Sequence, residues 1–214
     1  MIKENDFVMI NFVGRITATN QIFDLTDKSV AEKENIKGDY NFSPVLVIPG
    51  GNYVLKAVSD SLLNKNIGDK YEVTVAPKDG FGEFDKKLIK TYGLSVFRGN
   101  NINPSVGDMI MLDDRMATVL AINSGRVLVS YNHPLAGKEL KYSIEVLSII
   151  EDNKDKCSAI FEHYTGKKPD SVEIQGDSVK FTAKDDIKSY IKDGISQDIK
   201  KYINDKFTVE IIKQ

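Results

Sequence analysis

Few side chains in this sequence have the type and spacing of acid–base or nucleophilic machinery. Asp24 follows Phe23 at the end of a predicted strand, where a lone carboxylate is most simply an exposed turn residue. His133 lies in a predicted loop, where its imidazole most simply bonds to nearby backbone groups. Asp113 and Asp114 are adjacent, and neighbouring strand residues point to opposite faces, so they cannot readily share a proton. The motifs of zinc proteases, serine hydrolases and nucleotide-binding loops are absent from the sequence.

The cysteine and histidine content argues against a redox or metal site. Cys157 is the single cysteine and cannot form an internal disulfide. We interpret it as a small buried or half-buried residue of a helix rather than as a nucleophile. One cysteine and two histidines are too few for a structural zinc site. We therefore expect neither a metal nor a cofactor.

The composition is that of an ordinary soluble globular protein. The 214 residues include 29 Lys and Arg against 31 Asp and Glu, a net charge of −2, and 41% are hydrophobic. A protein dominated by phosphate contacts would show a basic excess, so we expect no nucleic-acid partner. No stretch approaches the roughly 18 apolar residues of a membrane helix, and no apolar leader follows the charged N-terminus. We expect a cytoplasmic protein without a membrane partner.

The N-terminal part reads as strands around one short amphipathic helix. Apolar and polar residues alternate, or run together, in short segments that Gly and Pro interrupt. A polar connection over 25–43, with one helical turn, joins two of the strands. We predict strands over 7–18, 22–24, 44–48 and 69–77, and a helix over 54–64.

The middle of the chain predicts a small all-β lobe. Apolar runs cover 108–112, 117–122 and 126–131, and the sequence Asn-Ser-Gly at 123–125 favours a hairpin turn. A long alternating strand over 140–149 follows. Three methionines of the lobe, Met109, Met111 and Met116, either present a flexible surface to many client chains or fill the core of the lobe. The lobe has few basic residues and little aromatic stacking surface, which disfavours nucleic-acid binding.

The C-terminal part predicts a third, α+β unit. The charged run at 151–156 is interpreted as a linker. Beyond it we predict a helix over 158–164, a hairpin of strands 171–174 and 179–183, an isoleucine-rich helix over 187–203 and a strand over 207–212. The isoleucine stripe is most simply packed on its own sheet.

Residues 132–146 closely resemble a known signature. They read NHPLAGKELKYSIEV, which is similar to the NHPLAGKxLxFxVxV signature of FKBP-type peptidyl-prolyl cis/trans isomerases. The segments 68–70 and 77–82 resemble two further FKBP elements, in the family's order. The insert resembles the one that replaces the flap in SlyD-type and archaeal long FKBPs. The resemblance covers about residues 1–150 and does not extend to 156–214.

The resemblance implies an α+β fold in three parts. An FKBP-like antiparallel sheet wraps a short helix, a small all-β lobe is inserted into it, and an α+β domain follows. The expected boundaries are 1–86 and 132–152 for the discontinuous isomerase domain, 87–131 for the lobe and 156–214 for the C-terminal domain.

The resemblance also implies an apolar proline pocket. It assigns the backbone N–H of Leu55 to the substrate carbonyl and places Val58 at the pocket floor. Phe81 replaces the usual Tyr, so a hydroxyl donor is missing, and Ala57 replaces a common Gly. The implied catalytic residues are Asp24, Leu55, Phe81 and Tyr142, and the implied substrate-binding residues are Phe12, Phe23, Val45, Val54, Val58, His133 and Leu135.

The function that the resemblance implies needs no acid–base set. Rotation about an X–Pro bond makes and breaks no bond, so a dry apolar pocket suffices. We expect a prolyl isomerase and folding chaperone whose lobe captures unfolded or partly folded proline-containing polypeptides. One alternative is a holdase or binding module with little isomerase activity. Another is a scaffold that forms a homodimer through its C-terminal domain.

Overall fold

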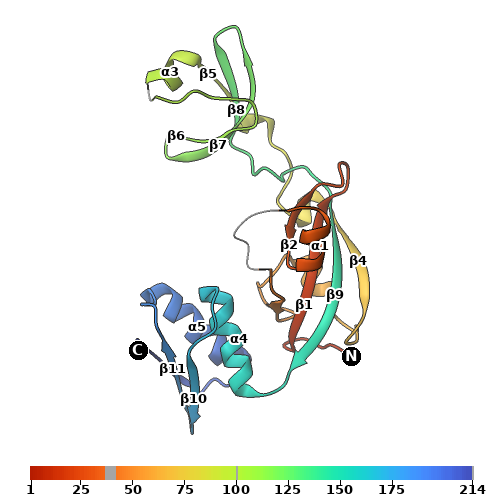
Figure 1. The fold of residues 1–214 in the computed structure, drawn as a ribbon, viewed down its shortest axis with the longest axis vertical. Coiled ribbons are helices and arrows are strands. Elements are labelled where there is room, and N and C mark those ends of the chain that lie inside the picture. Colours follow the sequence, from red (N-terminus) through yellow and green to blue (C-terminus); the bar gives the residue numbers. More distant parts are fainter. Residues whose placement is uncertain (37–41, 100, 214) are drawn as a thin grey trace. The chain divides into compact units, whose positions relative to one another are not determined.

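The structure is a computed structural model in which residues 1–36, 42–99 and 101–213 are described. The chain separates into two compact units (Figure 1). The first comprises Met1–Arg15, Gln21–Val73 and Lys141–Gln214, and the second comprises Ile16–Asn20 and Thr74–Leu140. Helices and mostly antiparallel strands make this an α+β protein, as predicted. None of the helices in the described ranges has the length and hydropathy that a membrane span requires.

A five-stranded sheet organises the N-terminal part. Its central strand pairs on one side with two short strands and on the other with the long strand that follows the lobe. The strands run in the order β2-β1-β9-β4, and β3 also pairs with β1. Two short helices, α1 and α2, accompany the sheet. The bounds are β1 Phe7–Ile16, β2 Ile22–Leu25, α1 Lys28–Lys33, β3 Val45–Val47, α2 Lys56–Ser61, β4 Lys70–Val75 and β9 Leu140–Ile150.

The central strand β1 is buried on both faces. Val8, Ile10 and Phe12 lie on one face and are at most 8% exposed. Phe7 and Met9 lie on the other face and pack into a core cluster with the C-terminal helices. Burial on both faces explains why residues 7–13 read as a near-continuous apolar run instead of a clean alternation.

The C-terminal segment forms a three-stranded sheet with two helices, and it shares a core with β1 and β3. The central strand pairs antiparallel with one neighbour and parallel with the last strand. Phe161 and Ile195 of the helices lie in the same cluster as Phe7, Leu46 and Ile48. The bounds are α4 Asn153–Thr165, β10 Ser171–Gln175, β11 Ser178–Ala183, α5 Ser189–Tyr202 and β12 Thr208–Lys213.

Cys157 is fully buried in α4, which confirms its interpretation as an apolar helix residue. Burial first, and then the nearby charge of Asp152, raises the pKa of its thiol to about 12. A thiol of this kind is protonated at neutral pH and is a poor nucleophile.

The prediction that residues 151–156 form a linker was wrong, because most of them belong to α4. Asp152 is the N-cap of the helix, and its carboxylate accepts hydrogen bonds from the N–H groups of Lys154 (2.8 Å) and Asp155 (3.1 Å). Asp155 lies in the first turn, where a negative charge interacts favourably with the helix dipole. The charged residues therefore start the helix.

The lobe lies in the second unit and has its own sheet and core. The strands run in the order β5-β8-β7-β6. The predicted turn at 123–125 joins β7 to β8, with positive φ at Ser124 (47°) and Gly125 (77°), as a type I′ hairpin requires. The lobe was predicted to be all-β, but it includes α3, whose Phe97 is fully buried against the strands. The bounds are β5 Ile89–Gly93, α3 Leu94–Gly99, β6 Met109–Leu112, β7 Arg115–Asn123 and β8 Arg126–Ser130.

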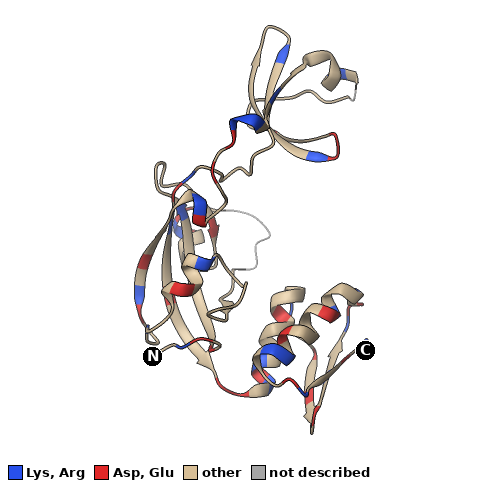
Figure 2. Cartoon of the chain, turned by 180° about the vertical axis from the view of Figure 1, so that it is seen from behind, with Lys and Arg blue, Asp and Glu red and all other residues tan. Residues whose placement is uncertain are grey.

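Acidic and basic residues are mixed along most elements of the first unit (Figure 2). In the lobe the charged residues of the strands and of α3 are basic, and Asp108, Asp113 and Asp114 lie in the segments that connect these elements.

The capping role of Asp152 predicts a defined loss of stability. Asp152→Ala should lower the free energy of unfolding by about 0.5–2 kcal/mol, because two N–H groups of α4 lose their acceptor. Urea denaturation followed by circular dichroism measures this change. Glu151→Ala is the control, because it removes an adjacent charge and leaves the cap intact. An equal loss in both variants would contradict the capping role.

Candidate functional site

An aromatic cluster of Phe12, Phe23 and Tyr142 lies on one face of the main sheet. The three residues come from the neighbouring strands β1, β2 and β9. The ring centroids of Phe12 and Tyr142 are 5.6 Å apart, with the rings tilted by 56°. Those of Phe23 and Tyr142 are also 5.6 Å apart, with an edge-to-face angle of 84°. These are the favourable geometries of aromatic pairs, and they fix a shared apolar surface.

Gly14 allows Phe23 to join this cluster. Gly14 pairs with Asp24 across β1 and β2 at a β-bulge. A Cβ added at Gly14 would lie 2.6 Å from Cζ of the Phe23 ring, closer than atoms can approach. The ring therefore lies directly over the backbone of β1, which only a residue without a side chain permits.

The pKa values of Asp24 and Tyr142 are both raised, and the charge of Asp24 contributes to the shift of Tyr142. The Asp24 side chain reaches solvent, yet surrounding protein removes part of its hydration and raises the pKa of the carboxyl, while the N–H of Leu25 opposes the shift. Burial, and then the charge of Asp24, raises the pKa of Tyr142 to about 12. The phenol therefore remains a neutral hydrogen-bond donor at physiological pH.

Leu55 stands at the start of α2 with extended backbone angles (φ −53°, ψ 139°). Its carbonyl accepts hydrogen bonds from the N–H groups of Val58 (2.9 Å) and Ser59 (3.0 Å). Among the residues that the structure describes, no acceptor is found for the N–H of Leu55 itself. The role of this N–H toward a substrate carbonyl stays a prediction of the resemblance.

The remaining expected pocket residues of the first unit are apolar. Val58 is 1% exposed, and Val45 and Val54 are partly buried. Val45 pairs with Ile10, so its side chain lies on the same sheet face as Phe12. The first unit thus places four expected pocket residues on paired strands of one sheet, namely Phe12, Val45, Phe23 and Tyr142.

The other three expected residues form a group in the second unit. The rings of Phe81 and His133 are stacked, with centroids 4.4 Å apart and an interplanar angle of 3°. Nδ1 of His133 accepts a hydrogen bond from the N–H of Leu135 (3.1 Å), which confirms that the imidazole bonds to backbone. How this group meets the aromatic cluster stays a prediction of the resemblance.

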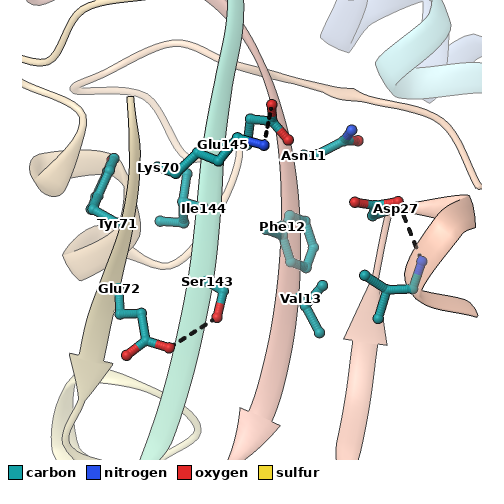
Figure 3. Close-up of a pocket in the computed structure, with 11 residues that line it drawn as sticks. Asn11, Phe12, Val13, Asp27, Lys70, Tyr71, Glu72, Ser143, Ile144 and Glu145 are labelled. Atoms are coloured by element: carbon teal, nitrogen blue, oxygen red, sulfur yellow. Dashed lines mark hydrogen bonds and ion pairs between the residues drawn. The ribbon is translucent and has the colours of Figure 1, made fainter. Parts of the chain in front are cut away.

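A cavity of about 370 Å³ is lined by residues of β1, β4, β9 and the start of α1, with Phe12 of the aromatic cluster among them (Figure 3). Asn11 of β1 and Ser143 of β9 also line it. Lys70 pairs with Glu145 (3.0 Å) in this cavity, and the Ser143 hydroxyl donates to Glu72 (3.3 Å). No group of three or more metal-ligating side chains occurs within residues 1–36, 42–99 and 101–213.

Comparison with known proteins finds relatives among FKBP-type isomerases. The family model of the FKBP26 IF domain matches residues 90–135, which overlap the predicted insert. A short-type peptidyl-prolyl cis-trans isomerase of Methanocaldococcus jannaschii is 25% identical over 150 residues, which is 70% of this chain and 94% of that protein. The FKBP-type isomerase SlyD of Helicobacter pylori is 27% identical over 126 residues, 56% of this chain and 68% of SlyD. SlyD of Haemophilus influenzae is 30% identical over 112 residues, 50% of this chain and 58% of SlyD.

The chain is similar to FKBP-type isomerases of the SlyD type. These findings agree with the resemblance carried by residues 132–146. The signature segment also has a structural role that the sequence reasoning missed. The Asn132 side chain accepts a hydrogen bond from the N–H of Asp85 and donates one to its carbonyl, both at 2.9 Å. These two bonds join the chain segments that enter and leave the lobe.

Gly14 is a second residue whose role the sequence reasoning missed. A glycine inside a strand pattern is a signal for close backbone approach, and the segment 7–18 does contain one. The identity of the ring above it depends on the pairing of β1 with β2, which one strand alone does not reveal.

The raised pKa of Asp24 predicts how its replacement affects stability. Because the folded protein holds the Asp24 proton more tightly than the unfolded chain, its stabilising contribution is present below pH 3.8 and is lost as pH rises through the raised pKa. Asp24→Asn, neutral throughout, should therefore match wild type in Tm below pH 3.8 and exceed it near neutral pH.

Asp27→Asn provides the control of opposite sign. Hydrogen bonds from the Ser29 side chain and from the N–H groups at the start of α1 lower the pKa of Asp27. Its replacement should lower Tm at neutral pH, with a smaller effect in acid. Thermal unfolding across the pH range measures both variants, and a Tm loss for Asp24→Asn that is largest at neutral pH would contradict the prediction.

Proposed function

We propose that this protein catalyses cis–trans isomerisation of X–Pro peptide bonds and that its inserted lobe holds unfolded client chains. The observation that carries the proposal is the aromatic cluster with the Asp24 carboxylate near Tyr142, in the same unit as the Leu55 N–H, for which no acceptor is found among the described residues. The printed names of the relatives, peptidyl-prolyl cis-trans isomerases, agree with it.

The chemistry matches a reaction that breaks no bond. The barrier to rotation about a peptide bond is about 18–20 kcal/mol, because amide resonance is lost on twisting. The planar amide is more polar than the twisted one, so an apolar surface of Phe12, Phe23 and Tyr142 favours the twisted form. The Leu55 N–H orients the substrate carbonyl, and the Asp24 carboxylate supplies a fixed charge beside the rotating bond.

The lobe supports client binding through an exposed apolar face. Met109, Met111 and Met116 are 61%, 57% and 50% exposed, so the alternative that they fill the core of the lobe is wrong. Met111 pairs directly with Met116 across β6 and β7, and Met109 lies two residues away on the same face. The opposite face of the hairpin, which includes Leu112 and Val119, packs into the lobe's core.

This arrangement suits a surface that holds many sequences. Exposed apolar groups gathered on one face of a small domain mark a binding surface. Methionine side chains adapt to different partners because they are unbranched and flexible. A client held at the lobe has a raised effective concentration for the isomerase site of the same chain. The holdase alternative has the same lobe and lacks only the catalytic step.

An isomerisation assay on a proline tetrapeptide decides between these two functions. The wild-type protein should accelerate exchange above the uncatalysed rate, and Phe81→Tyr should raise kcat/KM by about 2- to 10-fold by restoring one hydrogen-bond donor. NMR exchange spectroscopy measures both rates. Absence of acceleration by the wild type would leave the holdase function alone. An unchanged rate in Phe81→Tyr would mean that residue 81 does not face the substrate.

Replacing the three lobe methionines by Ser tests client capture. The triple variant should lose suppression of aggregation and slow proline-limited refolding of a protein several-fold, because its apolar face becomes polar. Tetrapeptide isomerisation should stay within about twofold, since a tetrapeptide is too short to reach both sites. Ile67→Ser is the matched control, because Ile67 is equally exposed (59%) and lies outside the lobe. Parallel losses on both substrates would contradict the capture role.

A further inference from the structure

The carboxylate of Asp198, in the C-terminal segment, accepts hydrogen bonds from two tyrosine hydroxyls that lie in different parts of the first unit. Tyr53 donates to Oδ2 of Asp198 at 2.7 Å, across 145 positions of sequence. Tyr164 donates to the same oxygen at 2.9 Å. Asp198 lies on α5 and Tyr164 on α4, whereas Tyr53 lies in the loop that precedes α2. The Tyr53 bond therefore ties this loop to the C-terminal helices.

The same loop is enclosed by further residues of these helices. The Tyr53 ring packs against His163, with centroids 4.4 Å apart, and meets Tyr202 edge-on at 6.2 Å. A Cβ added at Gly51 would lie 2.9 Å from the hydroxyl oxygen of Tyr202, so the loop backbone lies against α5. Ile48, at the start of the loop, is fully buried in the shared core cluster.

Two residues after Tyr53, the loop presents the N–H of Leu55. Leu55 is the N-cap of α2 and has no side-chain capping bond. Its N–H precedes the hydrogen-bonded ladder of the helix, so α2 alone does not hold this group in place. Two residues span about 7 Å of extended chain, so a shift of Tyr53 is passed on to the direction of this N–H.

We propose that Tyr53 and Asp198 are positioning residues for the isomerase site, through which the C-terminal helices fix the Leu55 N–H and the Val54 side chain. The inference rests on the proposed function, because it gives that N–H the substrate carbonyl as its acceptor. The C-terminal segment is on this view a structural component of the active site, although none of its residues touches the substrate.

The two tyrosines provide a matched pair for the test. Tyr53→Phe and Tyr164→Phe remove the same atom from the same carboxylate oxygen, but only Tyr53 belongs to the pocket loop. Tyr53→Phe should lower kcat/KM on a proline tetrapeptide by about three- to tenfold and speed hydrogen exchange at the amides of Val58 and Ser59, which donate to the Leu55 carbonyl. Tyr164→Phe should leave kcat/KM and the exchange rate within about twofold of wild type, even if its Tm falls as much as that of Tyr53→Phe.

Two variants of the acceptor, Asp198, repeat the comparison without a substitution in the loop. Asp198→Asn keeps an oxygen that accepts both hydroxyls and should retain activity, whereas Asp198→Ala should reproduce the loss seen in Tyr53→Phe. This second pair decides the question if Tyr53→Phe does not fold. Full activity in Tyr53→Phe, or equal losses in the two tyrosine variants, would overturn the positioning role.

Hydrogen exchange separates this inference from the proposed function. If the wild type itself fails to accelerate isomerisation, the proposed function is wrong. Faster exchange at the Val58 and Ser59 amides in Tyr53→Phe but not in Tyr164→Phe then still supports positioning of the loop by the helices, and equal exchange in the two variants overturns it.

Discussion

Burial of β1 on both faces is the constraint on which the first unit depends. One face carries Phe12 toward the aromatic cluster, and the other carries Phe7 into the core shared with α4 and α5. A substitution that alters the height or twist of this strand therefore affects the site and the C-terminal core together. The short strands β2 and β3 both pair with β1, so the residues they contribute to the site take their places from it.

The proposed site relies on geometry and apolar surface rather than on reactive groups. Its one carboxylate has a raised pKa because protein displaces water around it, and its one phenol remains protonated for the same reason. Both groups are therefore dipoles and charges of fixed orientation. Such a site suits a reaction whose difficulty lies in twisting a conjugated bond, where differential solvation of two conformers is the effective force.

Local patterns in the sequence were sufficient for much of this fold. Alternating or apolar segments located β1, β4, β9 and the lobe strands β6, β7 and β8, and residues 132–146 carried the family resemblance. The strand β5 and the helix α3 were not predicted, because the five residues of β5 and the six of α3, which ends at Gly99, give patterns too short to recognise. The start of α4 was misplaced since its charged first turn was interpreted by composition, although Asp152 was an available capping signal.

Long-range contacts could not be predicted from the sequence, for a different reason. The contact of Tyr53 with Asp198 joins residues 145 positions apart, and nothing in either local pattern indicates the other. The same holds for the ring of Phe23 above Gly14, which follows from a register and a bulge rather than from composition. Features of this kind depend on which elements pair, and that is settled only when the whole core is assembled.

The burial of Cys157 has a practical consequence for following the lobe in solution. The chain has no other cysteine, and this one is 0% exposed with a strongly suppressed thiolate. Thiol-directed fluorophores and spin labels therefore have no competing target on the native surface. A cysteine introduced at an exposed lobe position such as Val106, which is 65% exposed, can be labelled uniquely in the intact chain. Distances between a bound polypeptide and the lobe then become measurable by energy transfer without prior removal of native thiols.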